Sequence, residues 1–107
     1  MLGEVGKIRS VLEALARDFD ASALHGRASL ELLVELGAIQ SLLDGLKARV
    51  AKRIDETCAY VAVHDADAKY TVARAFGVQP SEAQRTIDLA ERLESLPAVD
   101  AAVRAGT

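Results

Sequence analysis

Residues 29–56 read SLELLVELGAIQSLLDGLKARVAKRIDE, and this stretch decides the fold. Its large apolar residues recur at steps of four, three, four, three, four and four, namely Leu32, Leu36, Ile39, Leu43, Leu46, Val50 and Ile54. Steps that average close to 3.5 residues place these side chains on one face of an α-helix. The pattern therefore predicts one long helix from about Ser29 to Glu56, with Ser29 as its N-cap.

Two features of this helix indicate neighbours on more than one side. Leu33 and Leu42 widen the apolar stripe beyond a strict coiled-coil seam. Gly37 and Gly45 each weaken an exposed helix by about 1 kcal/mol relative to Ala, which is tolerable if another helix crosses closely there. We therefore expect the long helix to form the centre of a packed helical domain.

Four further helices are predicted around it. They cover about Val5–Asp18, roughly Ala66–Phe76, a segment that begins within residues 78–84 and reaches Leu96, and Ala98–Ala105 after Pro97. Residues 60–63, YVAV, are β-prone but short and lack a second strand, so we expect a packed connector. The fold class is all-α: a single domain over residues 1–107, a bundle of about five helices around one long central helix, with a helix-turn-helix-like corner.

The ends of the third and fourth helices carry specific signals. Asp65 or Asp67 can cap the start of the third helix, and Gly77 can end it in the left-handed conformation. For the fourth helix two registers compete. Ser81 and Gln84 form a capping box, or Gln79 caps a helix whose first residue is Pro80, with Glu82 in its first turn.

Composition excludes several classes of protein. The chain has 107 residues, a formal net charge of −3 and one cysteine, so it can form neither an internal disulfide nor a thiolate zinc site. A lone cysteine favours a reducing compartment. The N-terminus does not resemble a signal peptide, and no apolar run reaches the roughly 20 residues of a membrane span. We expect a cytoplasmic protein with no membrane partner.

The corner between the third and fourth helices fits a helix-turn-helix template, with Ala73 facing Ala83 across Gly77. In that interpretation the residues that approach DNA are Arg74, Gln84 and Arg85. The alternative is an ordinary helical corner. Charge favours the alternative, because the fourth helix also carries four carboxylates, which repel phosphate: Glu82, Asp88, Glu91 and Glu94.

The long helix ends in a basic cluster of Lys47, Arg49, Lys52 and Arg53. These cations can contact DNA phosphates, but a solvated helix C-terminus explains them without a partner. Residues 64–67, HDAD, are better explained by capping than by a metal, and Cys58 is expected to be buried or half-buried. The chain shows no active-site motif, so we predict no catalytic residue, no metal site and no cofactor.

The apolar seam of the long helix also allows two arrangements. It can form a homodimer through Leu32, Leu36, Ile39, Leu43, Leu46 and Val50. Alternatively the first helix folds back on it and the third and fourth helices cover the rest. The second arrangement is favoured, because so long a helix offers more surface than one short partner covers.

Two stretches carry a resemblance to a known family. They are residues 46–56, LKARVAKRIDE, and residues 73–97, ARAFGVQPSEAQRTIDLAERLESLP, closed by residues 101–107, AAVRAGT. Together they resemble the N-terminal part of the domain of unknown function 222, found in 13E12-repeat proteins of actinobacteria. Gln79 stands where that family usually has Ser or Thr. The resemblance implies that the chain is a truncated N-terminal portion of a larger domain, which commonly precedes an HNH endonuclease domain.

The resemblance brings no catalytic residue with it. HNH chemistry uses a general-base His, an Asn and a further metal-ligating His, and this chain contains no Asn. Three hypotheses for function follow. The first is a non-catalytic module associated with HNH endonucleases, used for assembly or DNA positioning. The second is a small helix-turn-helix regulator, and the third is a helical homodimerisation module.

Overall fold

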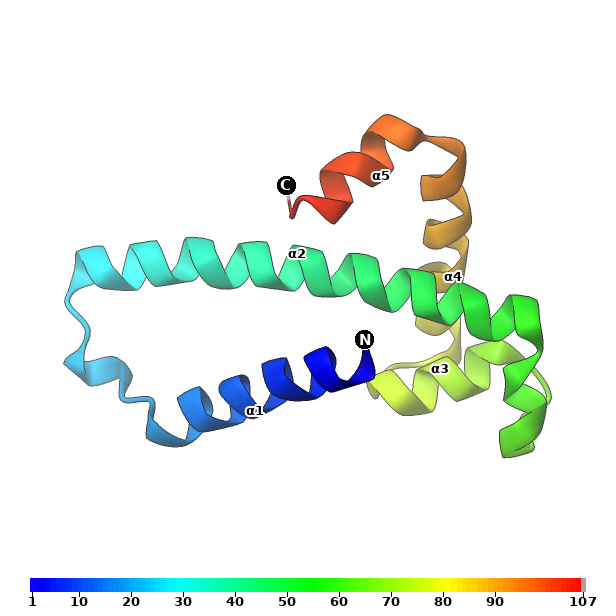
Figure 1. Ribbon diagram of the computed structural model, residues 1–107, viewed down its shortest axis with the longest axis horizontal. Coiled ribbons are helices and arrows are strands. Elements are labelled where there is room, and N and C mark those ends of the chain that lie inside the picture. Colours follow the sequence, from blue (N-terminus) through cyan, green and yellow to red (C-terminus); the bar gives the residue numbers. More distant parts are fainter. Residues whose placement is uncertain (107) are drawn as a thin grey trace. The chain divides into compact units, whose positions relative to one another are not determined.

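The computed structural model describes residues 1–106, except the side chains of residues 97–99, and this part of the chain contains helices and no strands. The all-α prediction is confirmed. Figure 1 shows the elements in order: α1 (Leu2–Asp18), η1 (Ala21–Ala23), α2 (Gly26–Thr57), η2 (Ala59–Val63), α3 (Ala68–Phe76), α4 (Pro80–Ser95) and α5 (Pro97–Arg104). The two η elements are short 3-10 helices.

The chain divides into two compact units, Met1–Leu33 and Val34–Thr107. The boundary lies within α2, so the long predicted helix contributes its first turns to one unit and the rest to the other.

In the first unit, side chains define the turn between α1 and α2. Asp20 Oδ1 accepts hydrogen bonds from the backbone N–H of Ser22 at 3.1 Å and from its hydroxyl at 2.6 Å, and these bonds lower the pKa of Asp20. His25 Nδ1 accepts from the Ala28 N–H at 3.1 Å, which is an N-cap contact, and α2 begins at Gly26. The prediction of Ser29 as the N-cap is therefore wrong: its hydroxyl donates to the His25 carbonyl from inside the helix.

In the second unit, a core of mostly small residues joins α2, α3 and α4. Ile87 is its largest fully buried side chain. Small side chains let the helix backbones approach closely. Truncation of a buried residue such as Ile87 to Ala lowers the free energy of unfolding by about 2–5 kcal/mol. The core consists of Ala51, Ala68, Val72, Ala73, Ala83 and Ile87, with Ile54, Tyr60, Phe76 and Val78 packed against it.

The corner between α3 and α4 agrees with the predicted glycine turn. Gly77 has φ +67° and its N–H donates to the Ala73 carbonyl. The second capping register is the observed one, because Gln79 occupies the N-cap position and Pro80 is the first helical residue. Ala73 and Ala83 both lie in the buried core, as the template requires.

Several predicted boundaries and contacts differ. α3 begins two residues later than predicted, after Asp67, whose side chain makes no capping hydrogen bond. The connector over residues 60–63 forms η2, and only its Tyr60 packs on the core, while Val61 is 62% exposed. Cys58, which was expected to be buried or half-buried, is exposed, and its backbone takes the left-handed conformation directly after α2.

Candidate interaction surfaces

Two opposite faces of α2 within the second unit differ in their burial. The face of Gly45, Ala48 and Ala51 is buried; we call it the small-residue face. The other face carries the predicted apolar seam and is exposed to between 43% and 59%; we call it the large-residue face, and it consists of Leu36, Ile39, Leu43, Leu46 and Val50.

Helix geometry explains why the two faces are opposite. Each residue advances about 100° around an α-helix, so two residues separated by two positions point in nearly opposite directions. Leu43 and Gly45 have this spacing, and so do Leu46 and Ala48. Whatever packs on the small-residue face therefore leaves the large-residue face open.

The small-residue face packs where α5 crosses α2. A Cβ built on Gly45 would lie only 2.8 Å from Val103 Cγ1 in α5. The sequence-based reason for Gly45, a closely crossing helix, is thus confirmed. No other helix within the described residues comes within 4 Å of a Cβ built on Gly37, so the same explanation is wrong there.

Two of the predicted DNA-contacting cations flank the small-residue face and form internal ion pairs. Lys52 Nζ donates to Glu94 Oε2 of α4, and this hydrogen bond raises the pKa of Lys52. Its side chain is only 13% exposed. Arg49 Nη1 lies 3.8 Å from Asp100 Oδ1 of α5 and is buried without a hydrogen bond. These two cations connect α2 to its neighbours.

The other two cations of the basic cluster differ from each other. Lys47 Nζ lies 4.5 Å from the centroid of the Phe76 ring, where a cation–π interaction holds it against α3. The Arg53 side chain is exposed and has no ion pair or hydrogen bond within residues 1–106. Of the four, Arg53 alone has its charge free in this part of the chain.

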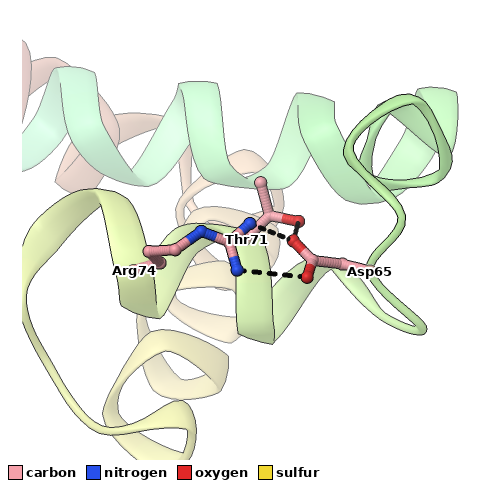
Figure 2. A network of polar contacts seen from close by, with 3 residues as sticks. All are labelled: Asp65, Thr71 and Arg74. Carbon is pink, nitrogen blue, oxygen red and sulfur yellow. Dashed lines mark hydrogen bonds and ion pairs between the residues drawn. The ribbon is translucent and has the colours of Figure 1, made fainter.

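The α3–α4 corner places the remaining predicted residues. Figure 2 shows that Arg74 donates two hydrogen bonds to the Asp65 carboxylate through its terminal guanidinium nitrogens, from Nη2 to Oδ2 at 2.6 Å and from Nη1 to Oδ1 at 3.2 Å. The Thr71 hydroxyl donates to Asp65 Oδ2 at 2.6 Å. The hydrogen bonds from Arg74, and to a smaller extent the one from Thr71, lower the pKa of Asp65. Asp65 therefore anchors the connector to α3 and does not cap it; of the two predicted candidates, Asp67 occupies the N-cap position.

On α4, Gln84 Nε2 donates to Asp88 Oδ1 at 3.0 Å, while Arg85 is exposed. A side chain already bonded to its own helix is not free to read a base edge without breaking that bond. The arrangement brings Arg74, Gln84 and Arg85 to one corner, but of the three only the Arg85 side chain has no ion pair or hydrogen bond within residues 1–106.

The first unit has an apolar surface of its own. No residue of α1 is buried, and its large apolar side chains from Val5 to Leu15 are 39–61% exposed. At the end of α1 an open groove of about 570 Å³ is lined by residues that include Val11, Leu15, Phe19 and Leu24. The lining is mainly apolar, and no predicted site residue lies in it.

Cys58 and the nearby acidic residues make no metal centre in the described part of the chain. No group of three His, Cys, Asp or Glu side chains is placed to hold an ion within those residues. The Tyr60 hydroxyl donates to Cys58 Sγ at 3.6 Å, and this contact raises the pKa of Tyr60. No helix within residues 1–106 is both long and apolar enough to cross a membrane.

The ion-pair partners of Arg74 and Lys52 were not predicted from the sequence. Arg74 and Asp65 are nine positions apart, across a turn, and Lys52 and Glu94 lie on different helices. Only the i to i+4 spacing of Gln84 and Asp88 offers a signal that a sequence can show.

Comparison with known proteins gives one match. The sequence model of a protein family, described as Domain of unknown function (DUF222), matches residues 30–107. No curated protein matches the chain, and no solved structure matches it.

Proposed function

The chain belongs to the family of the domain of unknown function 222, and from that premise we propose that it is a non-catalytic assembly module. It joins protein chains through the large-residue face of α2. One observation carries the proposal: five large apolar side chains in a coiled-coil-like repeat are each 43–59% exposed, while the same helix buries Gly and Ala. A contiguous exposed apolar patch of this kind is typical of an interaction site.

The charges support assembly over DNA positioning. The cations Arg49, Lys52 and Arg74 already pair with Asp100, Glu94 and Asp65. Binding to phosphate would break those ion pairs. DNA affinity depends on the number of phosphates that a protein neutralises, so a basic cluster occupied in this way binds weakly.

The proposed association with an HNH endonuclease rests on the family resemblance alone. If the parent protein continues into an HNH endonuclease segment in the cytoplasm, a module that joins chains would hold two such segments together. Cleavage would then belong to that segment and not to residues 1–107.

The test compares two leucines of equal exposure in the whole 107-residue chain. Leu43 on the large-residue face is 44% exposed, and Leu89 on α4, outside that face, is 43% exposed. We expect wild type and Leu89→Glu to gain mass with concentration in sedimentation equilibrium, and Leu43→Glu to remain monomeric with unchanged far-UV circular dichroism. Equal masses for all three proteins, or loss of helix in Leu43→Glu, would overturn the proposal.

A second proposal is DNA positioning by the α3–α4 corner, which is favoured by the Gly77 turn and by Arg85, whose side chain has no ion pair within residues 1–106. It predicts that labelled duplex DNA gains anisotropy at low salt, with binding that weakens steeply as salt rises. Arg85→Ala should remove the binding, and Arg17→Ala in α1 serves as the control. The absence of binding at 20 mM salt, roughly the range where such attraction is strongest, rejects this proposal.

A further inference from the structure

We propose that the partner of the large-residue face is the same face of a second copy of this chain, and that the two α2 helices run antiparallel. The inference rests on the proposed assembly function and adds the identity and direction of the partner.

The repeat suits a helix partner. Leu36, Ile39, Leu43, Leu46 and Val50 alternate steps of three and four, which is the spacing that lets one helix seat its side chains between those of another. The helices that pack on α2 in the second unit bury Gly45, Ala48 and Ala51 on the opposite side, while beside the large-residue face Lys47 contacts Phe76 of α3. A second helix can therefore lie along the large-residue face without displacing α3, α4 or α5.

Two charges at the ends of the face are complementary. Glu35 and Arg53 are 18 residues apart, which is about five full turns, so they lie on one line along the helix beside the apolar seam. Both side chains are exposed, and neither has an ion pair or hydrogen bond within residues 1–106. The neighbouring cations Lys47, Arg49 and Lys52 are all engaged inside the unit.

These charges select the antiparallel direction. In a parallel pair at equal register, Glu35 is level with residue 35 of the other copy and about 27 Å along the axis from its Arg53, so the two opposite charges cannot meet. In an antiparallel pair the same flank of both helices meets in reverse order, so Glu35 of each copy lies beside Arg53 of the other. A two-fold symmetric contact contains this ion pair twice.

The apolar layers are consistent with the same alignment. When Glu35 is near Arg53 of the other copy, Leu43 is level with Leu46 of the other copy and Ile39 is level with Val50. Four consecutive apolar layers then fill the centre of the contact, with opposite charges at both ends. The face is thus self-complementary in the spacing of its apolar residues and in charge.

The test is a charge-reversal set measured by sedimentation equilibrium on the full chain. Glu35→Arg alone and Arg53→Glu alone should each raise the dimer dissociation constant by about tenfold, because two attractive contacts become repulsive. The double variant E35R/R53E should recover the wild-type value, and an equimolar mixture of the two single variants should form mixed dimers as tight as wild type. Glu31→Arg is the control for a change of net charge.

The outcomes separate this inference from the proposed function. If wild type dimerises through Leu43 but the single reversals bind as tightly as wild type, the antiparallel arrangement is wrong and the assembly function stands. If the reversals weaken binding and the double variant fails to recover, the pairing of Glu35 with Arg53 is wrong. A wild-type chain that stays monomeric at several hundred micromolar overturns the inference.

Discussion

The two faces of α2 in the second unit differ in the size of their residues and in their burial. The small-residue face buries Ala48 and Ala51 completely or nearly so, whereas the large-residue face leaves Leu43 and Leu46 almost half exposed. Intuition assigns the largest apolar side chains to the interior, since each buried CH₂ contributes about 0.8 kcal/mol. Here close helix approach decides the interior, and the large side chains remain available for another molecule.

The largest expected effect comes from enlarging a residue on the small-residue face. Ala51→Leu forces extra methyl groups into the core around Val72 and Ile87, and we expect it to lower the free energy of unfolding by about 1–3 kcal/mol. Leu43→Ala on the opposite face should change it by less than about 0.5 kcal/mol at concentrations where the chain is monomeric. Urea unfolding followed by circular dichroism measures both, and equal losses would remove the distinction between the faces.

A smaller effect on stability is expected when either of two adjacent cations, Lys52 or Arg53, is replaced. Lys52 is paired with Glu94 and nearly covered, while Arg53 is exposed and unpaired within the described residues. We expect Lys52→Met to lower the stability of the monomer more than Arg53→Met does, and the difference to shrink in 1 M salt, where the Debye length is about 3 Å. Thermal unfolding of both variants at low and high salt measures this difference in stability. A greater loss from Arg53→Met would contradict the assignment of the two side chains to different faces.

The smallest effect concerns pH and the anchor of α3. The pKa of Asp65 is lowered in the folded chain, so its contribution to stability is complete above the unfolded pKa of about 3.9 and is lost as pH falls through the folded pKa. Asp65→Asn should therefore be less stable than wild type at pH 7, with the gap closing on acidification below about pH 4. Urea midpoints across this range measure the gap. A constant gap would mean that Arg74 does not stabilise the ionised carboxylate.

The sequence predicts the helices well because periodicity reports which residues share a face. Leu36 to Val50 follow that repeat, and α2 contains them as expected. Periodicity does not report which face is buried. Ala48 and Ala51 carry little hydrophobic signal, so the sequence does not show that α3 and α4 pack on their side of α2. Ile54, at the end of the seam, packs against that core, whereas Leu43, Leu46 and Val50 remain exposed.

The candidate site residues show the same limit. The positions of Lys52 and Arg74 on their helices follow from the sequence, but their partners Glu94 and Asp65 depend on how a turn and a helix crossing are arranged in space. His25 as the N-cap of α2 was missed because His is not among the residues that usually cap helices. Gly77 was identified because a left-handed residue between two helical patterns is a local property of the chain.

The most direct test of the central claim is disulfide formation between two single-cysteine variants, Ile39→Cys and Val50→Cys, both made with Cys58→Ser. In the antiparallel pair residue 39 of one copy is level with residue 50 of the other, whereas identical positions are separated by about 16 Å along the axis. We expect cross-linked dimers, identified by mass spectrometry, only when the two variants are mixed. Cross-links within each variant alone, or none in the mixture, would contradict it.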